Sequence, residues 1–213
     1  MDRAAKYVLL DNVQFEKNYF QNRCKIRNGK GSFQFITIPV KNSALSSLIL
    51  EKEIDTTNRL IKKSLATLRE CYSKSPFFKP YFAQIEEIVL GNSMLSRMNI
   101  ALIRLLSTEL GIKSELVIAS ELNLAGAMGG TQVTAEITKY LGGDEYLSGQ
   151  FGVDYLDTSY FNKLGIKVSF HEHAFTQYKQ HGDSEFVPAL SAVDLLFNCG
   201  PGSFECIRKD RKQ

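Results

Sequence analysis

The sequence predicts an α/β fold, in which a mixed and partly parallel sheet is flanked by helices. Three observations support this class: an Asn-Gly turn between two strand-like stretches near the start, a helical insert after them, and strands alternating with helices in the second half. With 213 residues, of which 44% are hydrophobic, the chain is long enough to bury a substantial core. We expect a single domain that covers residues 1–213.

The first part of the chain predicts strands and a hairpin. Residues 6–10, "KYVLL", form an apolar run that ends at Asp11, which places this carboxylate at the C-terminal end of a strand. Residues 24–40 are typical of a β-hairpin, because Asn28, Gly29 and Gly31 suit a tight turn and an apolar return strand follows. Residues 48–55, "LILEKEID", predict a further strand.

Residues 57–111 predict the helical insert. The first helix has Leu60, Ile61, Leu65, Leu68 and Tyr72 at three- and four-residue spacing, and Thr56 or Thr57 is expected to cap it. Residues 81–90 and 93–111 predict two more helices, the last of which ends at a glycine.

From residue 115 onward, the pattern alternates between strand and helix. Strands are predicted at 115–120, 145–149 and 166–173, with helices at 131–142 and 157–165 between them. Crossover helices of this length favour neighbouring parallel strands. A final helix is predicted at 191–200, followed by a basic tail.

Composition and charge exclude several classes of function. The net charge of +3 is small and the basic residues are scattered, so the sequence does not indicate nucleic acid binding. No apolar run is long enough for a spanning helix, no signal peptide is evident, and the four cysteines are far apart. We therefore expect a cytoplasmic protein with reduced thiols.

The three histidines do not predict a metal site. His171 and His173 would share one face of a strand and His181 follows, but the sequence offers no obvious further ligand to complete a zinc geometry. The glycines of "GGDEYLSGQFG" do not form a dinucleotide or phosphate-loop motif either.

The order of several short motifs resembles the WbqC-like protein family. These motifs run from about Tyr7 to Gly200 and read "LLDNVQF", "QNR", "FQFITIPV", "YLSGQFGVDYLD", "YKQ" and "FVPALSAVDLLFNCG". The positions that match the family are Asp11, Gln14, Asn22, Arg23, Tyr146, Ser148, Gly149, Tyr155, Tyr178, Gln180, Ser191, Asp194, Asn198 and Gly200.

The resemblance implies a role in bacterial surface polysaccharides, because genes of this family tend to lie in loci for O-antigen and related glycans. It favours a transferase that moves an acyl or aminoacyl group from a carrier-protein or coenzyme A thioester onto an amino-sugar nucleotide, with no bound cofactor. A non-catalytic glycan-assembly subunit that binds a sugar precursor or a carrier protein is the alternative. A third interpretation comes from the histidines and not from the resemblance: a hydrolase that uses the histidine cluster with a metal. Whether the chain is an enzyme stays open at this point.

Site roles follow from the resemblance together with the chemistry of the residues. Asp11 is the candidate general base or anchor for the substrate amine, and Arg23 is the candidate ligand for a phosphate or carboxylate. Amides, hydroxyls and rings suit a sugar, so we expect the remaining positions to gather with these two around one ligand. They are Gln14, Asn22, Tyr146, Ser148, Tyr155, Tyr178, Gln180, Ser191, Asp194 and Asn198.

Several of these residues also have a structural interpretation. Asp194 follows Ser191 by three positions and would complete a capping box. Tyr178 and Gln180 would tie down a long loop, while Asn22 would stabilise a bend and Arg23 would pair with a nearby acid. Cys199 is expected to be core packing rather than a nucleophile.

The sequence departs from the family in two places. Family members usually open with a further N-terminal segment, which we expect to be missing here, and carry His-Pro where this chain has Phe175-Thr176. Histidine is well suited to proton transfer near neutral pH, so these differences bear on catalysis. A missing strand would expose a sheet edge, to be covered by a partner or a second copy.

Overall fold

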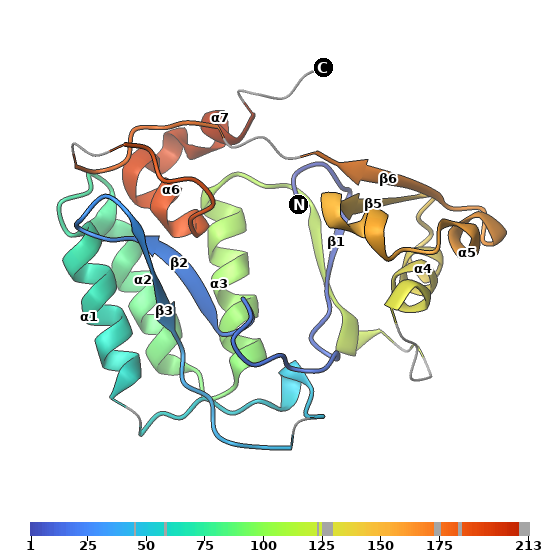
Figure 1. The fold of residues 1–213 in the computed structure, drawn as a ribbon, viewed down its shortest axis with the longest axis horizontal. Helices are drawn as coiled ribbons and strands as arrows, with labels where there is room; N and C mark the ends of the chain where they lie inside the picture. The colour runs from blue at the N-terminus through green and yellow to red at the C-terminus, as the bar shows by residue number, and fades with distance from the viewer. Residues whose placement is uncertain are drawn as a thin grey trace. The chain divides into compact units, whose positions relative to one another are not determined.

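The computed structural model describes residues 1–44, 46–57, 59–122, 124, 130–172, 176–182 and 185–208. The chain, drawn in Figure 1, divides into two compact units. The first unit comprises Met1–Glu121 with Phe175–Gln213, and the second comprises Leu122–Ala174. The expectation of a single domain stays a prediction.

The predicted α/β class is confirmed, with short parallel and antiparallel sheets flanked by helices. The first unit contains β1 (Lys6–Leu9), β2 (Arg23–Arg27), β3 (Phe33–Thr37), α1 (Leu60–Tyr72), α2 (Phe78–Gly91), α3 (Leu95–Glu109), β4 (Glu115–Ile118), α6 (Ala192–Cys199) and α7 (Ser203–Arg208). None of the helices within the described part of the chain is long and apolar enough to cross a membrane.

The predicted hairpin is confirmed as the antiparallel pair β2–β3. Lys25 lies opposite Phe35 and Arg27 lies opposite Phe33. The turn is closed by the Asn28 side chain, whose oxygen accepts hydrogen bonds from the backbone N–H groups of Lys30 and Ser32 at 3.0 Å each. This is the local bonding that favours asparagine in turns.

Strand β1 pairs in parallel with β4, with Leu9 opposite Ile118. The sequence instead predicted that 115–120, 145–149 and 166–173 would be neighbouring parallel strands. The structure pairs β5 (Glu145–Gly149) with β6 (Lys167–His171) in parallel, and gives β4 the N-terminal strand as its partner. The ends of β1 and β4 therefore lie together at one edge of this pair.

The strand predicted at 48–55 is wrong. Residues Ile49–Glu51 form a 3-10 helix, and their neighbours make isolated bridges, such as that between Leu48 and Gln14. The backbone N–H groups of Ile49 and Leu50 donate to carbonyls of the irregular 11–13 segment, so no regular ladder extends here. Helix α1 likewise begins at Leu60, three residues after Thr57, and Arg59 at its N-cap makes no side-chain cap.

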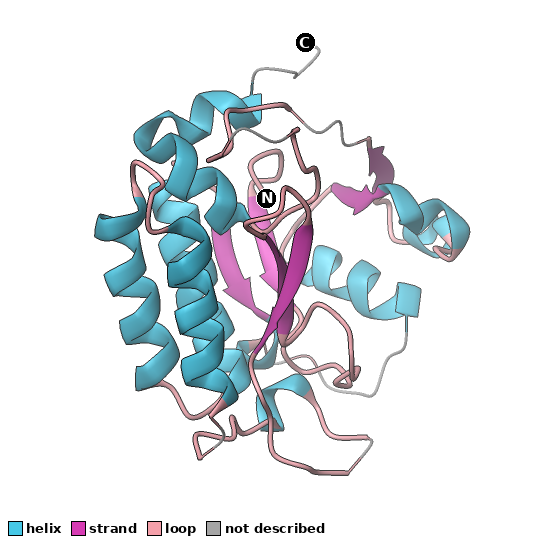
Figure 2. Cartoon of the chain, turned by 60° about the vertical axis from the view of Figure 1, so that its left-hand side comes forward, coloured by secondary structure: helices cyan, strands magenta, loops and turns pink. Residues whose placement is uncertain are grey.

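The core of the first unit lies between the hairpin and the helices. The long helices α1, α2 and α3 run side by side against the hairpin (Figures 1 and 2). Residues Ile26, Leu95, Leu196 and Phe197 are fully buried there. The alternation of the hairpin strands places Ile26 on this inner face, and therefore leaves Lys25 and Phe35 on the outer face.

The second unit is built from α4 (Gly130–Tyr140), β5, α5 (Thr158–Lys163) and β6. Its small core contains Ala135, Phe161 and Ile166, which are almost completely buried. Asp157 caps α5 by accepting a hydrogen bond from the backbone N–H of Ser159 at 3.0 Å. This β-α-β unit confirms the helix and strand pattern predicted for 131–173.

Candidate functional site

Asp11 and Ser120 meet at the C-terminal ends of the parallel strands β1 and β4. The two oxygens of the Asp11 carboxylate accept hydrogen bonds from Ser120, one from the backbone N–H at 2.9 Å and one from the hydroxyl at 2.6 Å. Asp11 is 8% exposed. The pair is thus a nearly buried carboxylate, held by an exposed serine, at the edge of a parallel sheet where ligands of α/β proteins usually bind.

The segment after Asp11 is held by its backbone. The Asp11 carbonyl accepts from the N–H of Leu50, and the Phe15 N–H donates to the carbonyl of Ser47, both at 2.9 Å. Gln14 forms a bridge with Leu48 between these two bonds. The 11–15 and 47–50 segments therefore run antiparallel to each other and fix the position of Asp11.

Asn22 and Arg23 stand at the start of β2. The Asn22 side chain donates to the carbonyl of Ile38 at 2.9 Å, which ties the two ends of the hairpin and fits the structural role of an asparagine in a bend. Arg23 has its guanidinium carbon 4.4 Å from the centre of the Phe35 ring. Within the described residues, its Nε is buried without a hydrogen-bond partner, so the ion pair expected for Arg23 is replaced by a ring contact.

Asp194 is the centre of a buried polar network. Its carboxylate accepts hydrogen bonds from the hydroxyl of Tyr72 at 2.7 Å, the hydroxyl of Tyr178 at 2.6 Å and the amide of Gln180 at 3.0 Å. Asp194 is completely buried in the first turn of α6. Three donors on one carboxylate satisfy a charge that would be costly to bury alone.

Gln180 joins this network to β2 and to its own loop. Its side-chain oxygen accepts from the Arg27 guanidinium at 2.6 Å and from the backbone N–H of Val187 at 2.8 Å, and its amide also donates to the Val187 carbonyl at 2.9 Å. The loop-tying role expected for Gln180 as one of its two interpretations is therefore observed. Arg27, which sequence reasoning did not single out, is 5% exposed and belongs to the same network.

The capping-box interpretation of Asp194 is wrong. Ser191 occupies the N-cap of α6 without a side-chain cap, and the Asp194 carboxylate points to the two tyrosines instead. Burial, together with the neighbouring carboxylate of Asp194, raises the pKa of both Tyr72 and Tyr178 well above the usual range. Both phenols therefore stay protonated and act as donors.

Ser191 and Asn198 stand on either side of Asp194 in the chain. The backbone N–H of Ser191 donates to the Lys25 carbonyl at 2.8 Å, which joins the start of α6 to β2. The Asn198 amide donates to the Asp194 carbonyl at 2.7 Å, and its oxygen accepts from the backbone N–H of His181 at 2.8 Å. Ser191 thus joins α6 to β2, whereas Asn198 joins α6 to the 178–181 segment.

Tyr146, Ser148 and Tyr155 belong to the second unit. Tyr146 stacks on Phe161 with ring centres 5.0 Å apart, and Ser148 is 3% exposed with its hydroxyl donating to the Gly149 carbonyl at 3.1 Å. Tyr155 is 67% exposed. Of the three, Tyr155 has a side chain free to meet a ligand.

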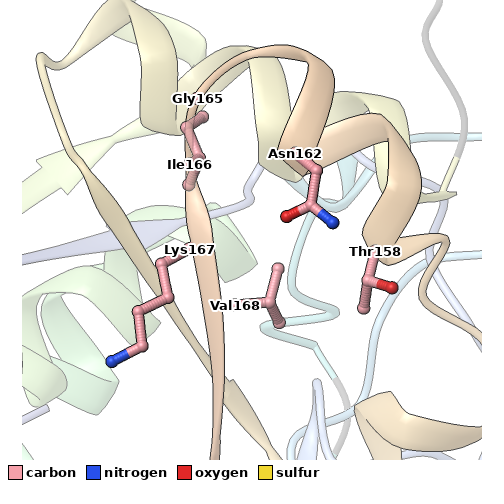
Figure 3. A pocket seen from close by; sticks show the side chains of 6 residues that line it. All are labelled: Thr158, Asn162, Gly165, Ile166, Lys167 and Val168. Carbon is pink, nitrogen blue, oxygen red and sulfur yellow. The ribbon is translucent and has the colours of Figure 1, made fainter.

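A hollow of about 520 Å³ lies beside α5 and β6 of the second unit. Figure 3 shows Thr158, Asn162 and Val168 facing one another across it, whereas Lys167 points to the other side of the strand. The lining offers a hydroxyl and an amide but neither a carboxylate nor a histidine. Such a set can hydrogen-bond a polar group, yet it does not provide acid–base chemistry.

The thiols and histidines do not form a reactive centre in the described structure. Burial, with the adjacent thiol of Cys206 at 3.9 Å, raises the pKa of Cys199 to about 12, which leaves it a weak nucleophile. Across the described ranges, no group of three or more His, Cys, Asp or Glu side chains is placed to hold a metal ion. His173, which is part of the histidine pattern, lies outside the described residues.

The structure gathers the predicted residues of the first unit into separate groups. Asp11 bonds with Ser120, Arg23 packs on Phe35, and Tyr178, Gln180 and Asp194 form the buried network. Arg23 and Arg27 stand at opposite ends of β2, roughly 13 Å apart at about 3.3 Å per residue. One ligand shared by all these groups stays a prediction.

Sequence reasoning missed Ser120, Tyr72 and Arg27. Ser120 is the last residue of the strand predicted at 115–120, so a pairing of this strand with the first one would have brought it to Asp11. Tyr72 was expected as an apolar position of a helix, and its hydroxyl gave no further signal.

Comparisons with known proteins agree with the motif order. A family model described as "WbqC-like protein family" matches residues 1–206. The chain is similar to a Mycobacterium tuberculosis protein named "Uncharacterized protein Rv1507c", with 29% identity over 211 residues that cover 97% of this chain and 89% of the relative. No solved structure matches the chain.

Proposed function

Because the chain belongs to the WbqC-like protein family, we propose that it works in the assembly of a bacterial surface polysaccharide. The proposed activity is transfer of an acyl or aminoacyl group from a thioester to the amine of an amino-sugar nucleotide. The thioester is carried by coenzyme A or by a carrier protein and is a substrate rather than a bound cofactor. The reaction would take place in the cytoplasm, where sugar nucleotides and coenzyme A thioesters are found.

The observation that carries this proposal is the Asp11–Ser120 pair at the carboxyl ends of β1 and β4. In the proposed reaction, the sugar amine attacks the thioester carbonyl, the new C–N bond forms, and the C–S bond breaks. Asp11 accepts the proton that the amine loses, and the thiolate leaves and is protonated. Ser120 holds the carboxylate in one orientation, so that a free lone pair can face the amine.

The test is an assay with purified protein, an amino-sugar nucleotide and an acyl or aminoacyl thioester, with the product detected by mass spectrometry. Asp11→Asn keeps the size of the side chain: its oxygen can still accept from the Ser120 backbone N–H, and its amide N–H can donate to the Ser120 hydroxyl, but the base is removed. We expect this variant to lose product formation while its melting temperature changes little. Asp144→Asn, at an exposed position, is the matched control and should keep full activity. Full turnover by Asp11→Asn would contradict the proposal.

A second function is favoured by the buried network around Asp194. The side chains of this network form hydrogen bonds with one another and with the backbone, as Tyr178, Gln180 and Asp194 show. Few of the predicted sugar contacts are therefore free to bind a sugar. A non-catalytic subunit that binds a sugar nucleotide or a carrier protein would need fewer reactive groups. For this function, a sugar nucleotide should raise the melting temperature without any product, and the lack of a shift at millimolar ligand would count against it.

A further inference from the structure

The outer face of the hairpin carries exposed aromatic rings. Tyr19 and Phe20 are each 56% exposed, and Phe33 and Phe35 are 45% and 40% exposed. We call this the ring-and-cation face; it consists of these rings with Arg23 and Lys25, all from the first unit. Two of these rings belong to the hairpin and two to the segment just before β2, and four large exposed rings so close together usually mark a binding surface.

The rings form a continuous series. The ring centres of Tyr19 and Phe20 are 5.9 Å apart, those of Phe20 and Phe35 are 6.1 Å apart, and those of Phe35 and Phe33 are 5.9 Å apart. Distances in this range are typical of aromatic pairs that stabilise each other. The face is therefore an ordered surface, because each ring restricts the next.

Two cations are held on this surface by the rings. The Arg23 guanidinium carbon lies 4.4 Å from the centre of Phe35, and the Lys25 ammonium lies 4.7 Å from the centre of Phe33 and 5.9 Å from that of Phe35. Such contacts orient a cation without neutralising its charge. Both positive groups thus stand beside one ring, close enough together to meet one small ligand.

Neither cation has an acidic partner in the part of the chain that the structure describes. The ion pairs found there involve other lysines and arginines, and the buried Nε of Arg23 has no hydrogen-bond acceptor. A positive charge next to apolar rings is less well solvated than one in open water, so its attraction for an anion is stronger. The charge of this face is therefore complementary to a negatively charged ligand.

We propose that the ring-and-cation face binds the nucleoside diphosphate part of a sugar nucleotide. The diphosphate would lie on Arg23 and Lys25, and the base would pack on the exposed ring of Phe20 or Tyr19. This inference rests on the proposed function in one respect, since it assigns a place to the nucleotide of that substrate. Two cations suit one diphosphate, whereas a polynucleotide needs a longer basic track, which the scattered charges of this chain do not form.

The inference can be tested by isothermal titration calorimetry, in which the full chain is titrated with uridine diphosphate. Guanosine and thymidine diphosphates are further probes. We expect binding that weakens with salt, and a loss of about tenfold or more in affinity for Lys25→Gln, since a charge-assisted contact is removed. Phe20→Leu should weaken the binding of the nucleotide but not the binding of inorganic pyrophosphate. Lys62→Gln, on the exposed side of α1, is the matched control and should bind as the unmodified chain does.

The outcomes separate this inference from the proposed function. The inference would be overturned if none of the three diphosphates bound at millimolar concentration. Unchanged affinity in a folded Lys25→Gln variant would also overturn it. So would tighter binding of a single-stranded oligonucleotide than of the diphosphates. Asp11→Asn should bind the diphosphate normally. Diphosphate binding that Lys25→Gln weakens, without any acyl transfer, would support this face and count against the transferase. Acyl transfer by Lys25→Gln with an unchanged KM for the sugar nucleotide would support the transferase and count against this face.

Discussion

At the scale of single residues, the clearest feature is the carboxylate of Asp194 with its three donors. Neither tyrosine is expected to ionise near neutral pH, because burial and the carboxylate of Asp194 raise the pKa of each phenol. The network is better explained as structural, because its hydrogen bonds connect α6 with α1, with β2 and with the loop residues Tyr178, Gln180 and Val187. Asp11, in contrast, is held by one neighbour at a strand end and stands apart from this network.

Tyr178→Phe should lower the free energy of unfolding by about 2 kcal/mol, because it removes one hydrogen bond to a buried carboxylate. Tyr72→Phe should cost at least as much, since the Tyr72 oxygen also accepts from the Arg27 backbone N–H at 2.8 Å. Urea unfolding measures both, with Tyr140→Phe at a 53% exposed position as the control. Equal stability of all three variants would show that the network does not stabilise the fold.

Cys199 should react slowly with iodoacetamide in the folded protein. A thiol whose pKa is raised to about 12 has a small thiolate fraction near neutral pH, and this fraction grows as the pH rises. Peptide mass spectrometry should show much slower alkylation of Cys199 in buffer than in urea, with the native rate increasing at alkaline pH. Equally fast alkylation in both conditions would contradict the assigned burial.

Residue contacts were predicted less well than residue types. The sequence placed Asp11 at a strand end correctly, because an apolar run followed by a carboxylate is a local signal. Its partner Ser120 is 109 positions away, and local patterns do not reveal which strands pair. The same holds for Tyr72 and Asp194, which are separated by 122 positions.

At the scale of elements, the hairpin and the helices were predicted well and one strand was not. The hairpin has a turn signal and the helices have a clear three- and four-residue period, so their structure is set locally. The segment 48–55 has similar apolar character, but it runs beside an irregular loop and becomes a 3-10 helix with single bridges. A strand needs a regular partner, which its own sequence does not specify.

The end of α6 depends on Gly200. This residue has a φ of 52°, and a Cβ placed on it would overlap the Phe77 ring. Gly200→Ala should therefore lower the free energy of unfolding by roughly 2 kcal/mol, through backbone strain and displacement of the ring. Gly29→Ala, where a Cβ meets no atom within 4 Å, is the control in thermal or urea unfolding. Equal effects of the two substitutions would argue against this packing.

At the scale of the whole molecule, the residues that the structure describes form two separate cores. The first contains Ile26, Leu95 and Phe197, and the second contains Ala135, Phe161 and Ile166. The second unit is encoded as one continuous segment between two parts of the first. The sequence showed no linker at its ends, which is why the division was not expected.

Phe161→Ala should destabilise the second unit in particular, because it removes a fully buried ring from a small core. Hydrogen exchange followed by mass spectrometry should show faster exchange in α4, β5, α5 and β6. Exchange in α1, α2 and α3 should stay as in the unmodified protein, and Leu95→Ala should give the opposite pattern. Uniformly faster exchange throughout the chain in both variants would mean that the two cores unfold as one.

The proposed role of this WbqC-like protein is to modify an amino sugar of a surface polysaccharide, with Asp11 as the base. Its most direct measurement is the mass of the glycan from a bacterium that lacks the gene, compared with strains that carry the unmodified chain or Asp11→Asn. We expect the glycan of the deletion strain to lack the mass of an acyl or aminoacyl group. The unmodified chain should restore this mass and Asp11→Asn should not. A glycan whose mass is the same in all strains, or is fully restored by Asp11→Asn, would contradict it.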